Sequence, residues 1–175
     1  MDLKMTGAIA FETALGRCAV SWSDAGISGV MLPRARAMPG RLAEDAGDVP
    51  AFVLRAIEGM RAVLEGAADD LRDIPVDHRG IDDFRLAVYA ATRRIAPGST
   101  RTYGEIARAI DRLEGARDVG VALSRNPTPI IVPCHRVVAA NGALTGFSAP
   151  GGLATKRRML ELEGAPGYGQ LSLFG

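Results

Sequence analysis

The sequence predicts an α/β protein in which a small N-terminal αβ domain with an antiparallel sheet precedes a helical C-terminal domain. The length of 175 residues suits one domain or two small ones. Short β-rich runs separated by glycine turns open the chain, and helical periodicity dominates its second half. A composition that is 47% hydrophobic and 23% charged provides a core and therefore excludes a largely disordered chain.

The first domain is expected to span residues 1–80. Its β-rich runs are joined by short turns and predict an antiparallel meander, with strands at 8–13, 18–22 and 27–32. Residues 33–50 are rich in Pro, Gly and charge and predict a loop, whereas the apolar spacing of residues 51–65 predicts a helix. One more strand is expected at residues 71–76, before a linker that begins at Gly80.

The second domain is expected to span residues 81–165 and to be mostly helical. A helix is predicted over residues 82–95, where a Pro-Gly pair stops it. Residues 102–105 fit a capping box, in which a Thr oxygen caps the helix and a Glu side chain returns to the cap amide. The short helix that follows and another at residues 116–124 make a helix-turn-helix candidate, although an ordinary helical hairpin has the same pattern.

The helix predicted at residues 116–124 has a face of small residues. Ala116, Gly120 and Ala122 allow close backbone approach, and the helix lacks the Asn and Gln that pair with adenine edges in a major groove. These features suit a protein that visits any DNA sequence and inserts one side chain into the duplex.

Charge is distributed unevenly along the chain. Residues 1–80 hold nine basic and twelve acidic residues, a net charge of −3, whereas residues 81–175 hold twelve basic and eight acidic residues, a net charge of +4. The basic excess of the second half is compatible with phosphate contacts, and an ordinary solvated face could carry the same charge.

Neither a membrane segment nor an export signal is expected. No run approaches the ~20 apolar residues of a membrane-spanning helix, and the N-terminus lacks a basic start, an apolar middle and a cleavage site. We therefore expect a cytoplasmic protein with no membrane partner, in which Cys18 and Cys134 remain free thiols. With His78 and His135 they have no finger or ribbon spacing. We expect no metal and no cofactor. A zinc site built from these two Cys and two His residues is the disfavoured alternative.

The sequence Pro133-Cys134-His135-Arg136 carries the most distinctive chemistry. A thiol with an ordinary pKa of about 8.5 is a weak nucleophile at neutral pH, and a neighbouring imidazole and Arg136 are expected to favour the thiolate. Because adjacent strand residues point to opposite faces, Cys134 and His135 need a turn or a bridging water to share a proton. A carboxylate must hold the imidazole, and Glu161 and Glu163 are the candidates. The structural alternative is an inert buried Cys beside a satisfied His.

A wider set of motifs surrounds this tetrapeptide. The chain reads Asn126-Pro-x-Pro-x-x-x-Pro-Cys-His-Arg-Val-Val, with Thr102-Tyr103-Gly104-Glu105-Ile106-Ala107 upstream and Gly151-Gly152-Leu153-x-x-Lys156 downstream. Over about residues 82–164 it closely resembles the O6-alkylguanine-DNA alkyltransferases, also called methylated-DNA–protein-cysteine methyltransferases. The resemblance implies a ribonuclease H-like N-terminal domain and a C-terminal winged-helix domain that carries the helix-turn-helix.

The resemblance also implies roles for individual residues. Cys134 would accept the alkyl group and keep it as a thioether. His135 would act as a base through water, with Glu163 as the carboxylate that orients it, because Glu163 directly precedes a glycine as the family's carboxylate does. Asn126 would brace the helix against the active-site loop. Tyr103 would donate its hydroxyl to the leaving purine and help to rotate the nucleotide.

The DNA and lesion contacts follow in the same way. Arg117 would enter the base stack in place of the flipped base, and Arg136 would add a DNA contact. The lesion pocket would be lined by Pro129, Phe147 and Ser148, with the backbone at Cys134 and Val137 reading the purine edge. Each role has a structural alternative: Tyr103 could pack on Val88, Arg117 could be solvated, and Glu163 could be a surface carboxylate with Glu161 as its rival.

Two departures from the family pattern concern the pocket. Phe147 stands where many members have Tyr, so a pocket hydroxyl is lost. Ala149 and Pro150 are two extra residues before the Gly-Gly pair, and they would lengthen the pocket loop.

The implied function is DNA repair by irreversible, stoichiometric transfer of an alkyl group from O6-alkylguanine to Cys134, with O4-alkylthymine as a further candidate lesion. The partner would be double-stranded DNA with alkylated bases, bound by a monomer that flips the base through a minor-groove helix-turn-helix. Two alternatives stay open. A non-catalytic lesion sensor or DNA-binding regulator is disfavoured because Cys134 is present, and a cysteine hydrolase is disfavoured because no feature supplies an oxyanion site.

Residues 166–175 form a C-terminal tail. The stretch Gln170-Leu171-Ser172-Leu173-Phe174 resembles the pentapeptide by which bacterial proteins dock onto the replicative sliding clamp. We expect Gln170, Leu171, Leu173 and Phe174 to be the contact residues, with the apolar side chains filling a pocket of the clamp. The alternative is that they pack back onto the core.

Overall fold

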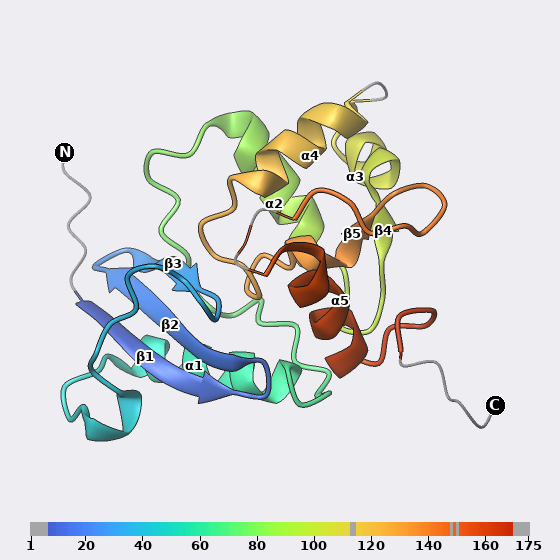
Figure 1. The fold of residues 1–175 in the computed structure, drawn as a ribbon. Coiled ribbons are helices and arrows are strands. Elements are labelled where there is room, and N and C mark those ends of the chain that lie inside the picture. Colours follow the sequence, from blue (N-terminus) through green and yellow to red (C-terminus); the bar gives the residue numbers. More distant parts are fainter. Residues whose placement is uncertain (1–6, 113–114, 148, 150, 170–175) are drawn as a thin grey trace, which may run out of the picture.

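The computed structural model describes residues 7–112, 115–147, 149 and 151–169. A three-stranded sheet with a helix against it makes up one side of the molecule, and four helices with a two-stranded sheet make up the other (Figure 1). The coarse prediction of an α/β fold with an antiparallel sheet is therefore confirmed. Within the described ranges, no helix is long and apolar enough to span a membrane.

The sheet of the first half is an antiparallel meander in the order β1-β2-β3, as predicted. Its strands are β1 (Gly7–Thr13), β2 (Gly16–Ser23) and β3 (Gly26–Met31). The turn into β3 depends on Gly26, which has φ of +140° and whose added Cβ would lie 2.6 Å from the Pro75 carbonyl oxygen. Glycine alone tolerates both conditions.

One helix covers this sheet, and a predicted strand is missing. Helix α1 (Ala51–Val63) buries Val53, Ala56 and Met60 in a core shared with the sheet. The loop before it contains a bridge from Leu42 to Ala10 and the short 3₁₀ turn η1 (Ala43–Asp45). The predicted strand at 71–76 is wrong, because Leu71 takes φ of +57° and only Val76 forms a bridge, with Ile27. A left-handed residue breaks the extended run that a strand requires.

The second half is mostly helical, as predicted, and the helices predicted at 82–95 and 116–124 agree with the structure to within two residues. Helices α2 (Asp83–Arg93), α3 (Tyr103–Ala109) and α4 (Ala116–Ser124) surround a second core, and α5 (Gly152–Leu162) follows the two-stranded parallel sheet of β4 (Arg101–Thr102) and β5 (Val137–Val138). The Thr102 and Glu105 side chains form the predicted capping box at the start of α3, which fixes where Tyr103 enters the structure.

The two halves are joined by buried contacts rather than by the linker alone. Ile130, Ile131 and Met159 belong by sequence to the second half but pack into the core of the first. The backbone amide of Val30 in β3 donates to the Pro127 carbonyl oxygen at 2.9 Å. The segment that leads to Cys134 is therefore held from both sides.

Candidate active site

Cys134 sits at the end of a buried, strained segment. Ile130 has φ of +74°, which redirects the apolar run before Pro133, and residues 134–136 then form the 3₁₀ turn η2 (Cys134–Arg136). This turn supplies the change of direction that the sequence required between Cys134 and His135. The Cys134 side chain lines a cavity although the residue is only 8% exposed.

Asn126 ties the end of α4 to this segment. Its Nδ2 donates to the Val132 carbonyl oxygen at 2.8 Å, and its Oδ1 accepts from the Thr128 amide at 3.0 Å. The same side chain lies close enough to the thiol to favour its ionised form. The structure thus places Asn126 where the predicted brace would be.

A buried ionic cluster lies behind Cys134. The His135 Nε2 atom is 2.8 Å from Glu163 Oε1, and the Arg136 guanidinium donates to both Glu163 oxygens and, through Nη1, to the Ile95 carbonyl oxygen at 2.7 Å. Burial opposes ionisation of Glu163, but His135 and Arg136 outweigh it and lower the pKa of this carboxyl to about 2. Glu161 is instead partly exposed and pairs with Arg158, so Glu163 is the carboxylate at His135.

This cluster fixes the tautomer of His135. An ionised carboxylate can only accept, so the Nε2 atom of His135 must carry the proton. Burial lowers the pKa of His135, which keeps the imidazole neutral even though Glu163 favours the charged form. Nδ1 therefore has a free lone pair, and it is buried without a hydrogen-bond partner among the described residues. The ring presents one available basic atom.

The resting state of Cys134 differs from the expectation. Burial raises the pKa of the Cys134 thiol, against the opposing effects of Asn126 and Lys156. The predicted stabilisation of a thiolate by His135 and Arg136 is wrong, because Arg136 faces Glu163 and the imidazole is neutral. The thiol is protonated at rest and needs a base.

Arg136 and Val137 also differ from the expectation. Arg136 is 2% exposed and its guanidinium is committed to Glu163 and Ile95, so it offers no surface to DNA. Val137 is fully buried, does not line the cavity, and its carbonyl oxygen accepts from Lys156. Both were assigned from neighbouring motif positions, which say nothing about the direction in which a turn points each group.

Lys156 is a site residue to which the sequence analysis gave no role. Its Nζ is buried and donates to the Val137 carbonyl at 2.7 Å, the Thr145 carbonyl at 3.1 Å and the Tyr103 hydroxyl at 3.3 Å. A buried ammonium is tolerated only when its donors are satisfied. The available signal was its spacing, since it shares the apolar face of α5 with Met159 and Leu160.

Tyr103 packs against the second core and also holds its hydroxyl in a fixed position. Its ring packs against the second core, which also contains Val88, while its hydroxyl donates to the Thr145 carbonyl at 3.0 Å. Lys156 lies 5.6 Å from the ring centroid and also donates to the hydroxyl. The hydroxyl is thus oriented beside the cavity that Cys134 lines.

A cavity of about 260 Å³ lies between the two halves at Cys134. A cavity of about 150 Å³ holds a benzene-sized ligand, so this one has room for a bicyclic base with a substituent. Pro129 and Phe147 line it as predicted, whereas the predicted Ser148 lies outside the described residues. Four lining residues come from the first half, which the sequence analysis did not anticipate: Val30, Met31, Leu32 and Ala35.

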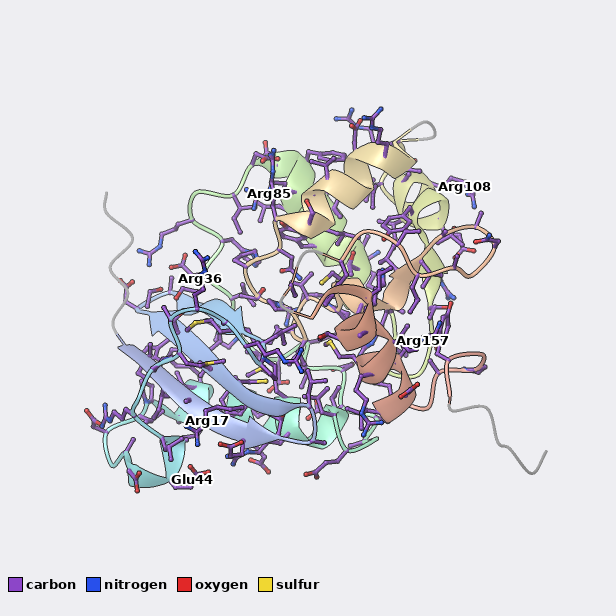
Figure 2. The ribbon with its side chains drawn as sticks, in the orientation of Figure 1. Arg17, Arg36, Glu44, Arg85, Arg108 and Arg157 are labelled. Carbon is purple, nitrogen blue, oxygen red and sulfur yellow. The ribbon has the colours of Figure 1, made fainter. Side chains whose placement is uncertain are left out.

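A second, more open groove follows α4. It has a volume of about 560 Å³ and is lined by Arg117, Gly120 and Val121 of the helix and by residues 145–147 opposite. Tyr103, Gly146 and Phe147 line both the groove and the cavity, so the two adjoin at these residues. Arg117 is exposed in this groove, and Figure 2 shows further basic side chains, Arg85 and Arg108, on the same helical half.

Among the described residues, no group of three or more His, Cys, Asp or Glu side chains could hold a metal ion, and both cysteines are free and buried. The fold and site thus define a protein with a buried cysteine that lines a cavity, a buried His-Glu pair that begins at the next residue, and a helix-lined groove that adjoins the cavity. Residues 83–165 match the family model of the 6-O-methylguanine DNA methyltransferase DNA-binding domain.

Relatives agree with this match. A methylated-DNA–protein-cysteine methyltransferase of Mycobacterium tuberculosis is 44% identical over 119 residues, which is 68% of this chain and 70% of the relative. One from Methanosarcina acetivorans is 51% identical over 83 residues, 47% of this chain and 52% of the relative. The crystal structure of M. tuberculosis OGT in complex with DNA matches with a TM-score of 0.73 at 32% identity, covering 92% of this chain and 96% of that one.

The chain belongs to the methylated-DNA–protein-cysteine methyltransferase family. DNA repair, DNA binding and methyl transfer to a protein cysteine are the properties of that family.

Proposed function

We propose that this protein repairs DNA by moving the alkyl group of O6-alkylguanine irreversibly onto Cys134, once per molecule. The observation that carries the proposal is the free Nδ1 of His135. Glu163 holds the ring through Nε2, which leaves the Nδ1 lone pair unpaired among the described residues, and Cys134, the preceding residue in the chain, lines the cavity. A base next to a nucleophile in this arrangement is the requirement for activating a thiol.

The proposed reaction starts with proton transfer. The Cys134 thiol gives its proton, through a bridging water, to Nδ1 of His135, and Glu163 stabilises the imidazolium that forms. The sulfur then attacks the alkyl carbon. The S–C bond forms as the C–O6 bond breaks, and the electron pair of the broken bond stays on guanine.

The leaving purine must gain a proton to depart as neutral guanine. The Tyr103 hydroxyl exchanges its bond to Thr145 for one to the purine N3 and donates its proton there. The proton taken from the thiol restores Tyr103, so the products are guanine and a thioether. No described group can displace a thioether carbon, which limits the protein to one transfer.

On the DNA side, we propose that α4 lies in the minor groove and that the damaged nucleotide rotates into the cavity. Arg117 is exposed on α4 beside the groove, where it can fill the space that the flipped base leaves. Extrusion costs a few kcal/mol and costs least for a poorly paired base. O4-alkylthymine is a second candidate lesion by the same chemistry.

The domain assignment is part of the proposal. We assign residues 1–80 to a ribonuclease H-like domain, residues 81–165 to a winged-helix domain with the helix-turn-helix, and residues 166–175 to a tail. The protein would act as a cytoplasmic monomer. The tail residues Gln170–Phe174, which lie outside the described residues, would bind the replicative sliding clamp.

Intact-protein mass spectrometry tests the proposal. The protein is incubated with a duplex that carries one O6-methylguanine, and the modified peptide is then mapped. We expect a gain of one methylene on Cys134 that stops at one equivalent. Tight binding without a mass change would instead indicate a lesion sensor, and repeated turnover on unmodified protein would indicate a hydrolase.

A further inference from the structure

We infer that the end of β3 limits the size of the alkyl groups that can reach Cys134, so that residues of the first half help to set the substituent range. The inference rests on the proposed function. The residues concerned, called here the β3 wall, are Val30, Met31, Leu32 and Ala35, and all four line the cavity that also contains Cys134.

The β3 wall is held rigidly. Met31 pairs with Ala19 in the sheet, and a turn in which the Ala35 amide donates to the Leu32 carbonyl oxygen closes the segment. The bond from the Val30 amide to Pro127 fixes the wall against the loop that carries Asn126 and Pro129. Its distance from the loop that leads to Cys134 is therefore set by hydrogen bonds rather than by side-chain packing alone.

The wall lines the cavity but not the α4 groove, where the proposed DNA contacts lie. Tyr103, Gly146 and Phe147 line both and so lie where the two adjoin. No wall residue lines the groove. A base that enters past Tyr103 has its transferred carbon at Cys134, and any atoms beyond that carbon extend into the space in front of the wall.

The chemistry of the wall suits a hydrocarbon substituent. Its four side chains are uncharged and apolar, and Met31 is a flexible thioether that adapts to ligands of different shape. Ala35 has the smallest of the four side chains and is only half-buried, so it leaves the most room and tolerates a larger residue. The wall also lies outside residues 83–165, the part that matches the family model.

The test compares two duplexes that differ only in the lesion, one with O6-methylguanine and one with O6-benzylguanine. Single-turnover rate constants are measured at saturating DNA for the wild-type protein, Ala35→Leu and Ala35→Phe. Ala37→Leu and Ala37→Phe are the matched controls, because Ala37 is exposed two residues away and does not line the cavity.

We expect the wild-type protein to react with both lesions. The ratio of benzyl to methyl rate constants should fall by about 10-fold in Ala35→Leu and further in Ala35→Phe, since one misplaced methylene in a pocket is worth 10-fold or more. Circular dichroism and the DNA affinity of each variant show that it is folded and binds DNA, and the methyl rate constant is the reference for the benzyl rate constant. The Ala37 variants should keep the wild-type ratio.

Three outcomes would overturn the inference. The wild-type protein could transfer methyl but not benzyl, the ratio could be unchanged in both Ala35 variants, or the two rate constants could fall in parallel. In each case methyl transfer by the wild-type protein leaves the proposed function standing. Failure of the wild-type protein to transfer methyl to Cys134 would overturn the proposed function itself.

Discussion

The molecule contains two buried cysteines in contrasting surroundings. Cys18 lies in β2 within the first core and is fully buried, and among the described residues the Thr13 hydroxyl lies 3.7 Å from its sulfur. Cys134 lines a cavity and has Asn126, Lys156 and His135 around it. Burial raises the pKa of both thiols, to about 11 for Cys18. A low resting pKa therefore does not distinguish the two thiols, whereas the cavity that Cys134 lines does.

The largest expected effect comes from exchanging the two thiols for hydroxyls. Cys134→Ser should abolish alkyl transfer, because a serine hydroxyl is a far weaker nucleophile, whereas Cys18→Ser should transfer at close to the wild-type rate once folded. Intact mass after incubation with an O6-methylguanine duplex measures both. Methylation of the Cys134→Ser protein at one equivalent would show that the comparison names the wrong cysteine.

The next largest effect tests the base. Glu163→Gln removes the negative charge that stabilises the His135 imidazolium, and transfer should slow by about 10²-fold or more. It also leaves Arg136 buried without a counterion, which should cost about 3–5 kcal/mol of stability. Single-turnover rates are measured below the melting temperature of the variant. Glu161→Gln, on the same helix end but paired at the surface, should match the wild-type protein in both measurements.

Lys156→Met tests the electrostatic contribution of the Lys156 ammonium to the surroundings of Cys134. Loss of the ammonium should raise the pKa of Cys134 further and free the Tyr103 hydroxyl from one of its partners. We expect a loss of about 10- to 100-fold in transfer rate, with a rate profile displaced to higher pH. Arg157→Met is the control, since Arg157 is exposed on the next position of α5. A merely structural role would lower the rate without moving the pH profile.

Stability in acid should also report on the ionic cluster of His135 and Glu163 beside Cys134, which Cys18 lacks. The pKa of Glu163 is depressed, so its contribution to folding is complete above 4.5 and is lost as pH falls towards about 2. The pKa of His135 is also lowered from 6.5, so protonation of this buried ring begins to favour the unfolded chain below that pH. Urea midpoints should fall from pH 6.5 downwards, and less steeply below pH 4.5 in Glu163→Gln than in the wild-type protein. Equal slopes would contradict the assignment.

Local signals made much of this site predictable, and tertiary contacts account for the rest. The capping box at Thr102, helix α4 and the pairing of His135 with Glu163 follow from short-range patterns or from a family motif. The direction in which Arg136 points could not be predicted, because it depends on Glu163 and Ile95 arriving from distant parts of the chain. The resting thiol was predicted wrongly for the same reason.

The first half shows the same limit. Its meander was predictable from β-rich runs and glycine turns, but the strand expected at 71–76 fails at the left-handed Leu71, which no propensity identifies. The contribution of Met31 and Ala35 to the cavity depends on contacts between the two halves, such as the hydrogen bond between Val30 and Pro127, about a hundred residues apart in sequence. Apolar patterning locates such residues in a core or loop and cannot show which cavity they line.

The smallest expected effect on alkyl transfer concerns the tail, residues 166–175. It should contribute to partner binding and should not affect the reactivity of either cysteine. The Tyr168 hydroxyl donates to the Gly142 carbonyl oxygen at 2.6 Å, and the Tyr168 side chain packs with Leu160 and Val138. These contacts remain when the chain is cut after Gly169. Deletion of residues 170–175 should therefore leave the transfer rate unchanged and abolish binding to a purified bacterial sliding clamp, measured by calorimetry.

Point variants test whether clamp binding requires particular side chains of the tail. Phe174→Ala removes an apolar anchor and should weaken clamp binding by about 10-fold or more, whereas Ser172→Ala, between the anchors, should bind like the wild-type protein. Equal clamp affinity of the truncated and full-length proteins would assign the tail no part in docking. A fall in transfer rate on truncation would instead mean that the tail supports the loop beside the cavity. The reactivity of Cys134 would then depend on the C-terminal residues, which is a further difference from Cys18.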